Sequence, residues 1–239
     1  MSDINLQTSH TNRSFDESLQ EINVQIIKMG ELVSEIIELA RKSFDKDSED
    51  HVKKARNLDK KLNSLDFDVQ QKATTMIALR QPMGVDLRFL VAALKMSSSL
   101  ERMGDLAKSS VRKATRFHDS ISIEIAGDLK EMTALAAKMV ADTMVAFRDL
   151  SIDKANDILD QDDDVDDVYH ALLKDVEKHI AKDKNLIPHF ADIVFAAKNM
   201  ERLGDHCTKM ADLIHYISSG ERVGKMGAQA EKAKESAEA

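Results

Sequence analysis

A five-residue string occurs twice in this chain, at positions one hundred residues apart. Glu101-Arg-Met-Gly-Asp105 returns as Glu201-Arg-Leu-Gly-Asp205, and each copy lies deep inside a long stretch of helical pattern. Such a recurrence is typical of a structural unit present in two copies, and an internal repeat constrains the fold more than any local signal. We therefore predict a tandem duplication, with units of roughly 100 residues, an ordinary domain size.

A second recurring segment lies upstream of each string. In the first half it is the pair Asp59 and Asn63, and we predict that its counterpart in the second half is the pair Asp162 and Asp166. The members of each pair are four residues apart, like the acidic residues that begin and end the five-residue strings. The repeat thus involves two segments in each half.

Composition and periodicity both predict an all-α protein. Hydrophobic residues make up 43% of the chain, aromatic residues only 4%, and there are two prolines and no tryptophan. Apolar residues recur every three or four positions, and no segment shows the two-residue alternation of a half-buried strand. We expect six long antiparallel helices in two three-helix bundles. The predicted helices cover about residues 14–44, 49–79, 86–117, 126–149, 152–181 and 187–218.

Turn residues and polar stretches predict the boundaries of the two units. The first three-helix repeat is expected over residues 14–119 and the second over 124–220, where Gly220 is a plausible end of the last helix. The polar residues 1–13 are expected to be disordered. The tail over 221–239, rich in Gly, Ala, Lys and Glu, is expected to be flexible.

Charge and cysteine content exclude several classes of protein. The net charge of −8 disfavours nucleic acid as a partner and direct adhesion to anionic lipid, because both need concentrated positive charge. Cys207 is the single cysteine, so an intramolecular disulfide and a cysteine-based zinc site are excluded, as is usual in a reducing compartment.

No apolar stretch approaches the roughly 20 residues that span a bilayer. We expect a cytoplasmic protein that reaches a membrane only through a partner.

The acidic pairs carry what chemistry the sequence offers. Glu101 and Asp105 are four residues apart, so they lie on one face of a helix, where like charges cost a few tenths of a kcal/mol. Either a bound cation or the neighbouring arginines, Arg102 and Arg202, could neutralise such a pair. Spacing alone does not choose between them.

The predicted hairpins bring these pairs toward one another. A turn at Pro82 places Asp59 opposite Glu101 and Asp105, and a turn over residues 182–185 does the same in the second unit. Carboxylate and amide oxygens from two helices form a site suited to hard or borderline cations. The alternative is a solvated acidic face, since the chain has 42 acidic residues. The predicted metal ligands are Asp59, Glu101, Asp105, Asp162, Asp166, Glu201 and Asp205.

The two predicted metal sites are not equivalent. Asn63 gives the first site less charge, whereas Asp163 and Asp167 add carboxylates to the second. Of the eight histidines, only His206, beside Asp205, is kept as a possible ligand. A storage or redox bundle of the ferritin type is a second candidate, but the chain has no Glu-x-x-His pair.

Catalytic signatures are absent from the sequence. No nucleophile with a base and an orienting group, no glycine-rich phosphate loop and no dinucleotide fingerprint occurs. We therefore do not expect an enzyme, and we do not expect direct sensing of phosphate. A purely structural helical scaffold is the third candidate.

Several of these segments together resemble the PhoU family of bacterial regulators of phosphate uptake and phosphate signalling. The resemblance lies in Leu-Glu-Arg-Met-Gly-Asp over residues 100–105 and Met-Glu-Arg-Leu-Gly-Asp-His over residues 200–206. It is extended by Arg-Gln-Pro over residues 80–82, which leads to Asp-Leu-Arg over residues 86–88. In all it covers the chain from about Phe15 to Gly220.

The resemblance implies a fold, a function and partners. It implies a tandem pair of three-helix bundles, often dimeric, whose acidic motifs can hold multinuclear clusters of iron or another metal. It further implies a non-enzymatic adaptor between the ATPase subunit of the phosphate ABC transporter and a sensor histidine kinase. Such an adaptor holds the phosphate-starvation response off when phosphate is plentiful, and it lies at the inner face of the membrane through its partners.

Overall fold

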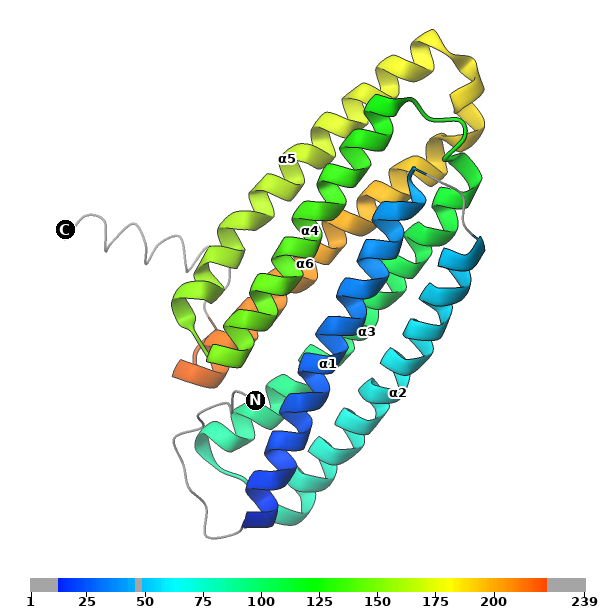
Figure 1. Ribbon diagram of the computed structural model, residues 1–239. Coiled ribbons are helices and arrows are strands. Elements are labelled where there is room, and N and C mark those ends of the chain that lie inside the picture. The colour runs from blue at the N-terminus through cyan, green and yellow to red at the C-terminus, as the bar shows by residue number, and fades with distance from the viewer. Residues whose placement is uncertain (1–12, 46–48, 223–239) are drawn as a thin grey trace, which may run out of the picture.

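The computed structural model describes residues 13–45 and 49–222, and within these ranges all regular structure is helical (Figure 1). The prediction of an all-α fold is therefore confirmed. The predicted disordered segment 1–13 and tail 221–239 lie outside the described residues, apart from Arg13, Glu221 and Arg222. The helices are α1 (Arg13–Ser43), α2 (Glu49–Arg80), α3 (Gly84–Phe117), α4 (Ile123–Asp149), α5 (Ile152–Lys182), the 3₁₀ helix η1 (Lys184–His189) and α6 (Phe190–Ser219).

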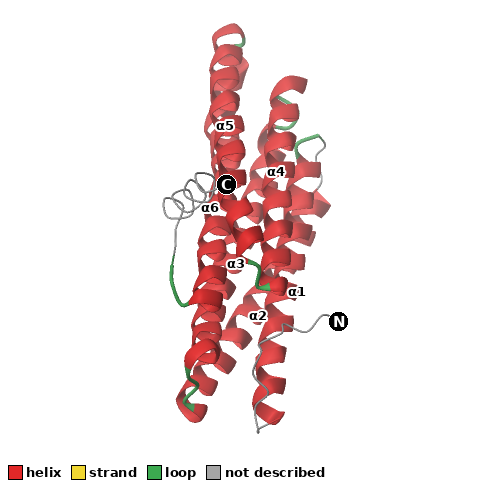
Figure 2. Ribbon diagram, turned by 90° about the vertical axis from the view of Figure 1, so that its left-hand side faces the viewer, coloured by secondary structure: helices red, strands yellow, loops and turns green. Residues whose placement is uncertain are grey.

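Two three-helix units lie side by side with their long axes roughly aligned. Helices α1, α2 and α3 form one unit, α4, α5 and α6 form the other, and α3 packs along α6 while α1 packs along α4 (Figures 1 and 2). The turn between α2 and α3 and the turn between α5 and α6 lie at opposite ends of the molecule (Figure 1). In the described part of the chain, none of the helices has the length and apolarity that crossing a membrane requires.

Local side chains determine where several helices begin and end. The Ser122 hydroxyl caps α4 by accepting a hydrogen bond from the Ile125 amide at 3.2 Å, as expected of serine at this position. Gly220 follows α6 with φ 86°, which confirms the predicted helix end. The sixth helix starts at Phe190, later than predicted, because the residues before it, including Pro188, form the 3₁₀ helix η1.

An apolar stripe along α1, of the kind that the periodicity of three or four residues predicts, forms the centre of the first unit. All of its members are buried, because α1 contacts α2, α3 and α4 together. Aromatic stacking contributes in two places: Phe44 stacks on Phe117 within the unit, and Phe89 of α3 stacks on Phe147 of α4 between the units. The buried stripe consists of Leu19, Ile22, Ile26, Met29, Leu32, Val33, Ile36, Ile37 and Ala40.

Gly30 allows α1 and α4 to approach closely. A Cβ atom at this position would lie 2.6 Å from Cγ of Met144, well inside van der Waals contact. A larger residue in this place would force Met144 to move or the two helices to separate. One contact between the units thus depends on the absence of a side chain.

Candidate functional site

An ion-pair cluster joins α2 and α3 in the first unit. Asp59 is only 6% exposed, and the Lys108 ammonium lies 2.7 Å from its Oδ2 and 2.6 Å from Oδ1 of Asp105. Burial lowers the pKa of Lys108, but its hydrogen bonds to Asp105 and Asp59 raise it more, so the pKa lies above 10.5. The two carboxylates predicted to face each other across the hairpin therefore do so, with a lysine between them.

Glu101 lies beside this cluster, where burial and the negative charge of neighbouring carboxylates disfavour its ionised form. Burial, followed by the negative charge of Asp105, raises the pKa of Glu101 above its usual range. Arg102 approaches only loosely, at 3.8 Å from Glu101 Oε2 and 3.9 Å from Asp105 Oδ2. Asp66, which the sequence analysis did not select, also contributes negative charge to Glu101, whereas Asn63 is exposed.

The glycines of the two repeated strings lie against different side chains of α2 and α5. A Cβ atom on Gly104 would clash with Cδ2 of Leu62, and one on Gly204 would lie 2.8 Å from Oδ1 of Asp162. The buried positions show which residues of the two helices correspond: Asp59, Leu62 and Val69 are buried in α2, and Asp162, Val165 and Leu172 are buried in α5 at the same spacing. This pattern agrees with the predicted correspondence of Asp59 with Asp162.

The second unit has a different charge arrangement. Thr208 stands where the first unit has Lys108, and its hydroxyl donates to the backbone carbonyl oxygen of Asp205 at 2.9 Å. Lys198 lies 2.6 Å from Oε1 of Glu201, while Oε2 is buried and accepts no hydrogen bond from any residue that the structure describes. Asp162 is buried, and Asp166 is half-buried.

These side chains, as arranged, do not fit a multinuclear metal cluster. Within residues 13–45 and 49–222, no three carboxylate, histidine or cysteine side chains lie close enough together to hold an ion. In the first unit, the place between Asp59 and Asp105 is taken by the Lys108 ammonium. The metal ligands named from the sequence stay a prediction. The residues that neutralise the acidic pairs are mainly Lys108 and Lys198. Neither lysine was predicted from the sequence.

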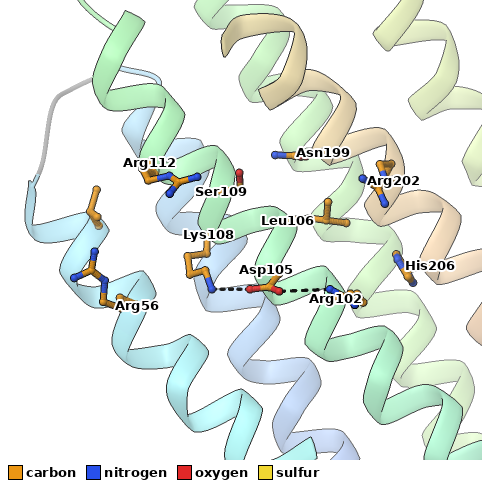
Figure 3. Close-up of a pocket in the computed structure, with 11 residues that line it drawn as sticks. Arg56, Arg102, Asp105, Leu106, Lys108, Ser109, Arg112, Asn199, Arg202 and His206 are labelled. Carbon is orange, nitrogen blue, oxygen red and sulfur yellow. Dashed lines mark hydrogen bonds and ion pairs between the residues drawn. The ribbon is translucent and has the colours of Figure 1, made fainter. Parts of the chain in front are cut away.

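A pocket rich in arginine lies next to the first acidic cluster, between α2, α3 and α6. Its volume is about 560 Å³. Figure 3 shows side chains from all three helices around it, with dashed lines linking Lys108, Asp105 and Arg102. We call it the arginine pocket, and it is lined by Val52, Arg56, Arg102, Asp105, Leu106, Lys108, Ser109, Arg112, Asn199, Arg202 and His206.

His206 forms part of the pocket wall and is neutral near pH 7. Burial, followed by the positive charge of Lys209, lowers its pKa to about 4. Its Nδ1 atom is buried and has no hydrogen-bond partner among the described residues. His206 was named as a possible ligand from the sequence only because it follows Asp205. The arginine pocket itself was not predicted.

The fold and the sites define a class: an all-α protein of two packed three-helix units, each with the same acidic string on its third helix. A model of the PhoU domain matches the chain twice, over residues 26–114 and 129–214, one match to each unit. The chain belongs to the PhoU family.

Known proteins match nearly the whole chain. A phosphate-specific transport system accessory protein PhoU homolog from Caulobacter vibrioides is 30% identical over 217 residues, which cover 90% of this chain and 94% of that protein. The accessory protein PhoU of Escherichia coli K12 is 27% identical, with 95% and 94% covered.

Solved structures agree with the arrangement of the helices. The crystal structure of PhoU from Pseudomonas aeruginosa has a TM-score of 0.82 and 25% identity, covering 87% of this chain and all of the other. The phosphate transport system regulatory protein PhoU from Streptococcus pneumoniae has a TM-score of 0.76 and 26% identity, with 87% and 99% covered.

Proposed function

We propose that this protein is a non-enzymatic regulator of phosphate uptake that holds the phosphate-starvation response off when phosphate is plentiful. The observation that carries the proposal is the match to phosphate transport accessory and regulatory proteins over both repeats, rather than over one domain. In mechanism, the protein connects the ATPase subunit of the phosphate ABC transporter with a sensor histidine kinase. A homodimer and a position at the inner face of the membrane are parts of the same proposal.

Exposed apolar side chains at the two ends of the molecule support an adaptor with two contact surfaces. At the α2–α3 turn, Leu79 is 74% and Met83 82% exposed. At the α5–α6 turn, at the opposite end in Figure 1, Ile187 is 55% exposed, and Phe195 on α6 is 57% exposed. Apolar side chains exposed together are frequent at protein interaction sites. Two such ends allow two partners to bind at once. For the binding of one partner to affect the other, the protein must have two conformational states that differ in their affinity for the partners.

Co-purification tests this arrangement. We expect the tagged protein from phosphate-rich cells to retain both the ATPase subunit and the kinase, and the retained ratio to change in phosphate-poor cells. Leu79→Ser/Met83→Ser is expected to lose one partner and Ile187→Ser/Phe195→Ser the other, each by about tenfold, the effect of a few interface anchors.

Val24→Ser supplies the matched control, because Val24 is an exposed apolar residue of α1 away from both turns. It is expected to retain both partners. Retention of neither partner by the unmodified protein, or a three-way association that phosphate leaves unchanged, would show that the adaptor mechanism is wrong.

A further inference from the structure

The arginine pocket concentrates positive charge in a chain that is acidic overall. Five cationic side chains line it, and Asp105 is its single carboxylate, although the chain carries a net charge of −8. The cationic residues are Arg56, Arg102, Lys108, Arg112 and Arg202. Cations gathered in this way repel one another, so a pocket of this composition is stabilised by an anion.

The carboxylates present leave most of this charge unneutralised. Asp105 is already engaged by Lys108 at 2.6 Å and reaches Arg102 only at 3.9 Å. Arg56, Arg112 and Arg202 form no ion pair with any residue that the structure describes. Three guanidinium groups therefore keep their donors available to a ligand.

The helices around the pocket fix the backbone positions of these exposed arginines. Arg56 belongs to α2, Arg112 to α3 and Arg202 to α6, so the pocket exists only when the two units are packed together (Figure 3). A buried hydrogen bond from the Asn199 amide to the Ser110 hydroxyl, at 3.1 Å, is one of the contacts between the units beside the pocket. The Cα positions from which the arginines extend are thus set before a ligand arrives.

We propose that the arginine pocket binds a small molecule that carries two or more linked phosphate groups. Guanidinium groups form paired hydrogen bonds with phosphate oxygens, and they do so better than lysine. The volume of about 560 Å³ lies in the range of small-molecule sites. Arg56 and Arg202 lie on opposite sides of the pocket (Figure 3), so a ligand that contacts both must be extended. Such a site could not be predicted from the sequence, because the arginines come from three helices and not from a glycine-rich loop.

Isothermal titration of the purified full-length chain with inorganic triphosphate tests the proposal. The protein is first treated with EDTA and dialysed, so that metal binding at the acidic residues does not contribute. We expect saturable binding that weakens as salt is added. Arg56→Gln/Arg202→Gln should weaken it by about tenfold or more, the effect of losing charge-assisted hydrogen bonds.

Arg80→Gln is the control, since Arg80 is an exposed arginine of α2 outside the pocket, and it should bind like the unmodified chain. Thermal melts of all variants show whether they remain folded. Orthophosphate and ATP form the other arms, with orthophosphate expected to bind at least about tenfold more weakly because it reaches fewer arginines at once.

Three results would overturn the proposal. Triphosphate fails to bind at millimolar concentration, it binds equally to Arg56→Gln/Arg202→Gln, or orthophosphate binds as tightly as triphosphate. A hexaglutamate peptide that binds where triphosphate does not would assign the pocket to an acidic protein segment instead. Because all of these titrations use purified protein, they are independent of the regulatory function proposed above.

Discussion

Replacement of Phe89 by alanine is expected to lower the free energy of unfolding by about 3–5 kcal/mol, the usual cost of removing a buried phenylalanine. The Phe89 ring is fully buried and stacks on Phe147, with 6.4 Å between the ring centroids and 13° between the rings. Alanine leaves a cavity where α3 of one unit meets α4 of the other. Urea unfolding of both proteins measures the difference.

The double-mutant cycle with Phe147→Ala separates stacking from burial. We expect a coupling energy of about 0.5–1.5 kcal/mol beyond the burial term. Val24→Ser, at an exposed position, is the control and should change stability by less than about 0.5 kcal/mol. A loss below about 1 kcal/mol for Phe89→Ala would mean that the two units are not packed through these rings.

Replacement of Lys108 by methionine is expected to cost about 2–3 kcal/mol, somewhat less than breaking a fully buried ion pair, because the lysine is partly hydrated. The change leaves Asp59, whose side chain is 8% exposed, without its cationic partner beside Asp105. The free energy of unfolding at pH 7 measures the loss.

Two variants test the cause of this effect. Lys178→Met breaks an exposed pair with Asp175, in which the ammonium also lies 2.7 Å from a carboxylate oxygen, and should cost less than about 0.5 kcal/mol. Lys108→Met/Asp59→Leu should recover most of the stability, since no buried charge is left unpaired. If Lys108→Met proves as harmless as Lys178→Met, Asp59 is not held by the lysine in solution.

The helices could be predicted because the spacing of apolar residues that specifies a helix is local and repeated along the chain. The apolar stripe of α1, from Leu19 to Ala40, recurs every three or four positions for about six turns, and all of its members are buried. The start of α6 was predicted less well, because Pro188 and the cap formed by Asp183 produce a short 3₁₀ helix whose residues look like the beginning of the helix.

The sites were predictable only in part, because their residues come from separate helices. The hairpin turn placed Asp59 near Asp105, but Lys108, which joins them, was missed even though Asp105 and Lys108 have the i,i+3 spacing of an ion pair. The contact of Gly104 with Leu62, and that of Gly204 with Asp162, depend on how the helices pack. Such information lies in tertiary structure, and a match between acidic residues does not contain it.

In the function proposed above, the protein holds the phosphate-starvation response off. The most direct measurement is a phosphate-starvation reporter in phosphate-rich medium, in strains that carry the gene, lack it, or have it restored on a plasmid. We predict that the reporter is silent with the gene, switches on when the gene is deleted, and becomes silent again when the gene is restored. A reporter that stays silent after deletion would contradict the proposed regulatory function.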